Sequence, residues 1–122
     1  MLQSAYPLFR VESAAAARAF FEPLGFEQIF EGSASDDPYK PDPCYMGFQR
    51  DEVIIHASSH SGDGAGGAVV VIVVDDVNAL HAEFVAKGVV IDLPPIDQTW
   101  GVREMYIKDG QNNALRFAQP LD

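Results

Sequence analysis

The chain has 122 residues, of which 48% are hydrophobic and 21% are charged, which suits one compact domain. Its formal net charge of −10 argues against a nucleic-acid partner, because phosphates attract a basic surface. No apolar run is long enough to span a bilayer, and the N-terminus has no features of a signal peptide, so we expect no membrane partner. The single cysteine, Cys44, cannot form an internal disulfide, which favours a reducing, cytoplasmic location.

The first half of the chain predicts one strand, one helix and three further strands. The elements expected are a strand over 5–11, a helix over 14–24, and strands over 26–31, 45–49 and 52–58. Ser13 is a suitable N-cap for the helix, and Gly25 is suited to end it. Residues 32–43 are rich in Ser, Asp and Pro and are expected to form a loop.

The second half predicts the same order after a linker rich in Ser and Gly over 61–67. The elements expected are a strand over 69–74, a helix over 77–87, and strands over 89–92, 102–108 and 114–118. Asp75 or Asp76 caps the helix, and Gly88 ends it. Pro94-Pro95 is expected to break the strand before it.

The two halves also repeat residue by residue. Val11 and Val74, Phe21 and Phe84, and Gly25 and Gly88 are pairs whose members lie 63 positions apart. Each half of the chain therefore independently predicts the same order of elements, βαβββ. We predict an α+β fold of two tandem modules, 1–60 and 68–122, within one structural domain.

A repeated βαβββ order resembles the vicinal oxygen chelate superfamily, which includes glyoxalase I, extradiol dioxygenases, fosfomycin-resistance enzymes and bleomycin-resistance proteins. The segments that carry the resemblance are Leu8-Phe9-Arg10-Val11, Ala19-Phe20-Phe21, Leu24-Gly25-Phe26, Gly47-Phe48-Gln49-Arg50, Val74-Asp75-Asp76-Val77, Trp100-Gly101-Val102-Arg103-Glu104 and Asp109 to Phe117. Trp100-Gly101 and Gln49-Arg50 are most similar to the bleomycin-resistance group. One departure is the turn after Asp109, where the family usually has Asp-Pro-Asp-Gly. Asn112 tolerates a left-handed backbone, so the turn should survive.

The resemblance implies an architecture and a mode of action. It implies a cupped mixed sheet and a homodimer in which the N-terminal strand is exchanged near Pro7. It also implies two pockets, each between modules of different chains, that bind a ligand by stacking and charge without chemistry.

The superfamily's enzymes hold a divalent metal on four strand positions, two from each module. By motif alignment these positions are Tyr6, His56, Val69 and Arg116. Only His56 is an ordinary ligand, since Val69 has no donor atom and Arg116 carries a fixed positive charge. We therefore expect no metal, no cofactor and no catalytic residue.

Strand alternation places His56 and Arg116 on faces directed toward the cavity. Tyr45 aligns with an aromatic residue of the bleomycin-resistance pocket, and Trp100 and Tyr106 are further candidates. The alternative for Tyr45 and Tyr106 is core packing, and for Trp100 a structural or rim position. Arg116 could instead pair internally with Glu104 or another carboxylate. The predicted ligand-binding residues are Tyr6, Tyr45, His56, Trp100, Tyr106 and Arg116.

The favoured prediction is a metal-independent protein of the bleomycin-resistance type that sequesters an aromatic or glycopeptide-like small molecule at a dimer interface. One alternative is a glyoxalase-like or dioxygenase-like metalloenzyme with a degenerate metal site around His56. Another is an accessory or immunity module that acts through its dimer surface, with the pocket filled by its own side chains.

Overall fold

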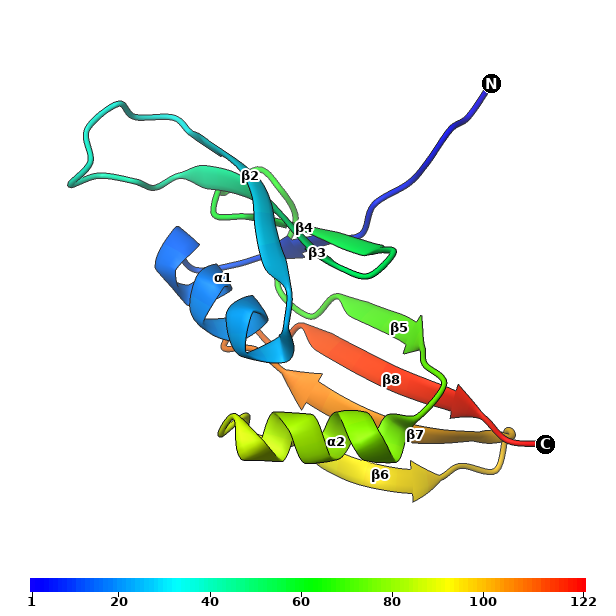
Figure 1. Ribbon diagram of the computed structural model, residues 1–122. Coiled ribbons are helices and arrows are strands. Elements are labelled where there is room, and N and C mark those ends of the chain that lie inside the picture. Colours follow the sequence, from blue (N-terminus) through cyan, green and yellow to red (C-terminus); the bar gives the residue numbers. More distant parts are fainter.

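The computed structural model describes residues 1–122 and contains two modules of the predicted βαβββ order (Figure 1). The elements are β1 (Leu8–Arg10), α1 (Ala14–Phe21), the short 3-10 helix η1 (Glu22–Leu24), β2 (Glu27–Ser33), β3 (Cys44–Arg50), β4 (Val53–Ser58), β5 (Val69–Val73), α2 (Val77–Ala86), β6 (Leu93–Asp97), β7 (Val102–Lys108) and β8 (Ala114–Pro120). The predicted α+β fold is therefore confirmed. None of the helices has the length and apolar character that a membrane span requires.

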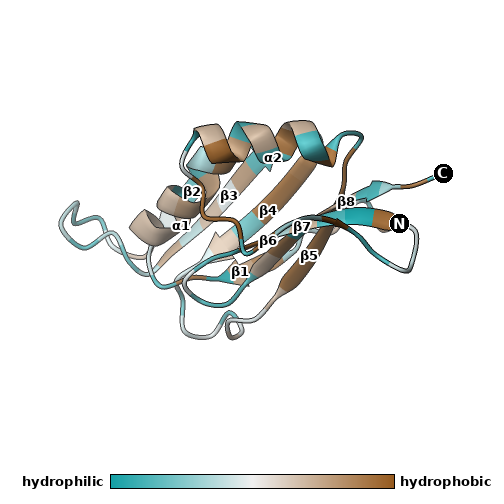
Figure 2. Cartoon of the chain, turned by 90° about the horizontal axis from the view of Figure 1, so that it is seen from below, coloured by the Kyte–Doolittle hydropathy of each residue, from teal (hydrophilic) through white to brown (hydrophobic).

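Each module forms its own four-stranded mixed sheet. The strand orders are β1-β4-β3-β2 and β5-β8-β7-β6, and the first strand of each module pairs in parallel with the last. The remaining pairs are antiparallel. Both helices lie on the same side of the strands, which leaves the opposite faces of the two sheets without a helical cover (Figure 2).

The helix boundaries follow the predicted capping residues. The side chain of Ser13 accepts a hydrogen bond from the backbone N–H of Ala16, and Asp76, not Asp75, caps α2 through the N–H of Ala79. Gly25 adopts a left-handed backbone with φ 81° where the first helix ends. Asn112 also has a positive φ of 61°, so the expected turn between β7 and β8 forms without the family's usual residues.

The hydrophobic core is continuous between the modules and fills the space under the helices. Phe21 of α1 stacks on Phe48 with ring centroids 4.6 Å apart, and Phe84 of α2 contacts Phe117 at 5.4 Å. The strand faces opposite His56 and Arg116 are buried: Ile55 and Ala57 in β4, with Val53 partly buried, and Leu115 and Phe117 in β8. The alternate residues of β4 and β8 consequently point to the face opposite the helices.

Two sets of polar contacts join the modules, one around Arg50 and one around Asn113. The Arg50 guanidinium binds the Glu83 carboxylate of α2 at 2.7 and 2.9 Å, and it also donates to the carbonyl of Leu24 at 2.8 Å. This hydrogen bonding lowers the pKa of Glu83. The fully buried Asn113 accepts from the N–H of Ala68 at 3.0 Å and donates to the carbonyl of Arg10 at 2.9 Å.

Three elements differ most from the prediction. The strand expected over 89–92 is wrong, because β6 spans Leu93–Asp97 and contains both prolines. This is an edge strand, and its register is irregular between Leu93 and Ile96, so the prolines need not donate to the ladder. The expected strand over 5–11 is shortened to Leu8–Arg10, and the first helix ends in a 3-10 turn that contains Pro23.

Candidate functional site

Four aromatic side chains gather on the uncovered face of the first sheet. The rings of Tyr6 and His56 are stacked with centroids 4.6 Å apart and an interplanar angle of 18°. Phe30 meets His56 edge-on at 5.2 Å and lies nearly parallel to Tyr45 at 6.1 Å. The Tyr45 hydroxyl lies 2.7 Å from Nδ1 of His56. We call these four residues the aromatic cluster; it contains all three site residues predicted in the first module.

Gly47 makes the aromatic cluster possible. Phe30, Gly47 and His56 are direct neighbours across β2, β3 and β4. A Cβ atom on Gly47 would overlap the Phe30 ring, so only glycine lets this ring lie flat across β3 and reach His56. Phe30 was missed in the sequence because the pairing of β2 with β3 is interrupted between Gln28 and Phe30, and such a shift cannot be read from alternation.

Burial shifts the pKa values of two members of the aromatic cluster toward their neutral forms. Burial lowers the pKa of the His56 imidazole, which favours its neutral form. Burial, with a smaller contribution from the Asp63 charge, raises the pKa of Tyr45. The Tyr45 hydroxyl and Nδ1 of a neutral His56 therefore share one hydrogen bond. Neutral rings with one polar edge suit stacking against a planar ligand.

A second group of side chains lies on the second sheet. The Arg116 guanidinium lies over the Tyr106 ring, 4.6 Å from its centroid, from the directly opposed position on β8. The Trp100 Nε1–H donates to Glu104 Oε1 at 2.7 Å, and Gln98 donates to the Tyr106 hydroxyl at 3.4 Å. We call Trp100, Glu104, Tyr106 and Arg116 the arginine cluster; it contains the other three predicted site residues.

Two polar atoms in the arginine cluster are buried without a partner, Glu104 Oε2 and Arg116 Nε. Glu104 is only 4% exposed, yet it forms no ion pair with Arg116, so the internal pair considered as an alternative is not present. Burial and then the nearby Glu104 charge raise the pKa of Tyr106. Glu104 was considered in the sequence only as a partner of Arg116, although it shares the alternating face of β7 with Tyr106.

The superfamily's metal does not fit these residues. Of the four aligned positions, Tyr6 stacks on His56 and has its hydroxyl hydrogen-bonded by Ser4, while Nδ1 of His56 is bound by Tyr45. Val69 has no donor atom, and Arg116 would repel a cation. Across the chain, no three His, Cys, Asp or Glu side chains are grouped closely enough to hold an ion. We therefore derive no metal-dependent step.

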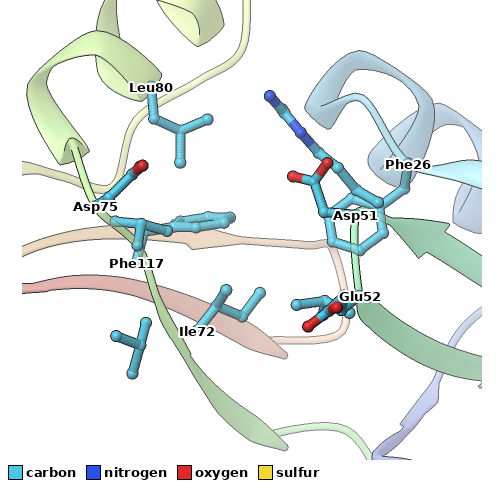
Figure 3. A pocket seen from close by; sticks show the side chains of 11 residues that line it. Phe26, Asp51, Glu52, Ile72, Asp75, Leu80 and Phe117 are labelled. Carbon is cyan, nitrogen blue, oxygen red and sulfur yellow. The ribbon is translucent and has the colours of Figure 1, made fainter.

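The largest hollow in the molecule lies elsewhere, in a cleft of about 520 Å³ between the two modules (Figure 3). It is bordered by the β3–β4 turn on one side and by β5 and the start of α2 on the other. None of the six predicted site residues lines this cleft. The pattern of neither module predicts this cleft, because it is created by the packing of one module against the other.

Comparison with known proteins agrees with this architecture. A family model described as "Glyoxalase superfamily protein" matches residues 1–122. The chain belongs to the glyoxalase superfamily. The expected resemblance to the vicinal oxygen chelate superfamily, of which glyoxalase I is a member, is therefore confirmed. A search of curated proteins found no match.

Solved structures of the glyoxalase superfamily share the fold over nearly the whole chain. A bleomycin-binding protein complexed with bleomycin is 22% identical with a TM-score of 0.75, and 97% of this chain and 98% of that chain are covered. A bleomycin resistance determinant encoded on the transposon Tn5 is 22% identical, with a TM-score of 0.76 and 98% of both chains covered. A glyoxalase/bleomycin resistance protein from Catenulispora acidiphila is 20% identical, with a TM-score of 0.70 and 94% and 96% covered. At these identities the likeness establishes the fold.

Proposed function

We propose that this protein binds an aromatic or glycopeptide-like small molecule without a metal, as a stoichiometric capture protein of the bleomycin-resistance type. The observation that carries the proposal is the aromatic cluster, in which Tyr6, Phe30 and Tyr45 surround a neutral His56. Affinity would come from stacking and buried apolar area, and no bond would be broken. The two solved relatives named for bleomycin support this class of ligand.

The complete pocket is proposed to need two copies of the chain. The aromatic cluster and the arginine cluster lie on different sheets, and each would face the other cluster of a partner copy. The face of β5 beside Arg116 supports this arrangement, since Val71 and Val73 are 57% and 71% exposed on a strand that is apolar along its length (Figure 2). Exposed apolar surface of this kind is typical of an interface.

Exchange of the N-terminal segment remains part of the proposal. Pro7 accepts a hydrogen bond from the His56 N–H of its own chain and Tyr6 stacks on the same His56, so an exchanged segment would comprise the residues before Tyr6. Met1 and Leu2 are fully exposed and extend away from the module (Figure 1). In a dimer, Tyr6 would then be positioned by both subunits. We place the protein in the cytoplasm, where its single buried Cys44 stays a free thiol.

Titration with copper-free bleomycin A2 tests the proposed function. Trp100 is the only tryptophan, and its side chain is 61% exposed. Because it belongs to the arginine cluster, its fluorescence reports on ligand binding there. We expect saturable binding of one ligand per chain, unchanged by EDTA, in a protein that light scattering shows to be a dimer. Tyr45→Ala should weaken binding about tenfold or more, whereas Tyr39→Ala, a change at an exposed loop tyrosine, should not.

Two results would contradict the proposal in different ways. If calorimetry detects no heat of binding and the Trp100 fluorescence does not change up to about 1 mM bleomycin, the proposal that bleomycin is the ligand is wrong. Binding that EDTA abolishes and zinc restores would instead favour the metal-dependent alternative around His56.

A further inference from the structure

The cleft between the modules has the dimensions of a ligand site. Its volume of about 520 Å³ falls within the range of roughly 300–1,000 Å³ that is usual for small-molecule sites. Figure 3 shows side chains from both modules converging on it, with Phe26 and the β3–β4 turn facing Leu80 and Phe117. The cleft shares no residue with the aromatic cluster or the arginine cluster, although Val73 of its lining also belongs to the proposed dimer face.

The floor of the cleft is apolar. Phe26, Ile72 and Phe117 are core residues that present one side to the cleft, and Leu80 and Val53 extend this surface. No polar group on this floor could replace the water around a bare ion. The floor therefore favours an organic molecule with a ring or a branched apolar body.

The rim of the cleft is acidic. Asp51 and Glu52 stand on the β3–β4 turn, and Asp75 stands across the opening at the start of α2 (Figure 3). The carboxylates of these three residues form no ion pair and accept no hydrogen bond within the chain, in contrast to the neighbouring capping residue Asp76.

The one basic residue at the cleft, Arg50, offsets this rim only through the charge of Asp51, with which it forms no ion pair. Arg50 directs both terminal nitrogens to Glu83 and one of them also to the Leu24 carbonyl, so its charge is already paired. Carboxylates above a low-dielectric wall focus a negative potential into the opening. A ligand with a positive charge at the rim and an apolar body on the floor complements both features, whereas an anion would be repelled.

We propose that the intermodule cleft is a binding site for a small organic cation, a protonated amine or quaternary ammonium ion carried on an apolar ring system. The cation lies between Asp51, Glu52 and Asp75, and the ring system packs against Phe26, Ile72, Leu80 and Phe117. Such a ligand bridges the two modules at the edge where Arg50 and Glu83 already join them.

The probe for this proposal is berberine, a planar quaternary ammonium ion whose fluorescence increases in apolar surroundings. The full-length protein should bind it saturably in the micromolar range, and the anionic dye 8-anilinonaphthalene-1-sulfonate should not compete. The variant Asp51→Asn/Glu52→Gln/Asp75→Asn should weaken berberine binding about tenfold or more. The matched control Glu22→Gln/Glu27→Gln/Asp36→Asn removes the same charge at exposed sites outside the cleft and should change binding less than about twofold.

A second variant tests the shape of the site. Leu80→Phe adds volume on the apolar surface of the cleft without adding charge, and it should also weaken berberine binding, with circular dichroism unchanged. Chemical shifts of the Ile72 and Leu80 methyl groups should move on titration in the wild type. No saturable binding up to about 1 mM overturns the proposal, as does binding that both cleft variants leave unchanged or that only Tyr45→Ala abolishes. The bleomycin titration is unaffected by these outcomes, because the two sites share no residue.

Discussion

The Tyr45 hydroxyl lies 2.7 Å from Nδ1 of His56 and holds the imidazole in place beneath the Tyr6 ring. His56 is the one residue at the superfamily's metal positions with an ordinary ligand atom, and in this chain it serves as the centre of an aromatic stack. A histidine used this way should be neutral when the protein is folded, which gives a measurable dependence of stability on pH.

Stability should fall as the pH is lowered through the range in which His56 titrates. Burial lowers its pKa in the folded state, while the unfolded chain has the ordinary value of about 6.5. The unfolded state therefore binds the proton first, so the contribution is fully present above about pH 6.5 and is lost as the pH falls through the folded-state pKa. Urea unfolding between about pH 7.5 and about pH 5.5 should show this loss, and His56→Gln should reduce it. His81→Gln, on α2, is the control; equal slopes in all three proteins would contradict the prediction.

Gly47→Ala should displace the Phe30 ring. The new methyl group would occupy the space of that ring, and Phe30 is exposed enough to swing outward, so the free energy of unfolding should fall by only about 1 kcal/mol. Bleomycin binding should be weakened more strongly, because the aromatic cluster loses the Phe30 ring as a stacking surface. In a Phe30→Ala background the same substitution should have little effect. A double-mutant cycle measures this coupling, and additive effects would argue against it.

Asn113→Ala should destabilise the protein by about 2–4 kcal/mol, because it leaves buried backbone groups of both modules without partners. Asn113 is fully buried and bonds Ala68, Arg10 and the Asp109 carboxylate. The matched control is Asn78→Ala, a change at an exposed position on α2. Urea denaturation followed by circular dichroism compares the two, and a loss no greater than that of the control would be inconsistent with Asn113 joining the modules.

Trp100→Phe should lower the free energy of unfolding by about 1–3 kcal/mol although the side chain is largely exposed. The indole N–H donates to Glu104 Oε1 at 2.7 Å, and phenylalanine would remove this donor from a carboxylate whose Oε2 is already buried without a partner. The penalty should shrink in a Glu104→Gln background, where no charge is buried. Thermal unfolding at neutral pH measures both penalties, and equal losses in the two backgrounds would contradict this role.

The parts of the structure that were predictable are those fixed by local chemistry. Ser13 begins the first helix, Gly25 and Gly88 follow the ends of the two helices, and alternation in β4 places His56 opposite Ile55 and Ala57. The position of β6 was missed because two consecutive prolines indicate a break, whereas an edge strand tolerates them.

The site was harder to predict because it depends on contacts between distant segments. The six residues are predicted to share a pocket only across a dimer interface, and within one chain they form two clusters on two sheets. Phe30 enters the first cluster only through an irregular register and a glycine on the next strand. The acidic cleft depends on how the modules pack, and that information is not present in the periodicity of either one.

The segment between the modules has a consequence for how the repeat can change. Gly67 donates a hydrogen bond to the Gln111 carbonyl, and any side chain on Gly66 would overlap the same carbonyl. The linker at Gly66 and Gly67 therefore packs against the β7–β8 turn and is not a flexible linker. A substitution that moves the backbone of that turn would require a compensating change in the linker. The two halves of this duplication are therefore constrained to change together.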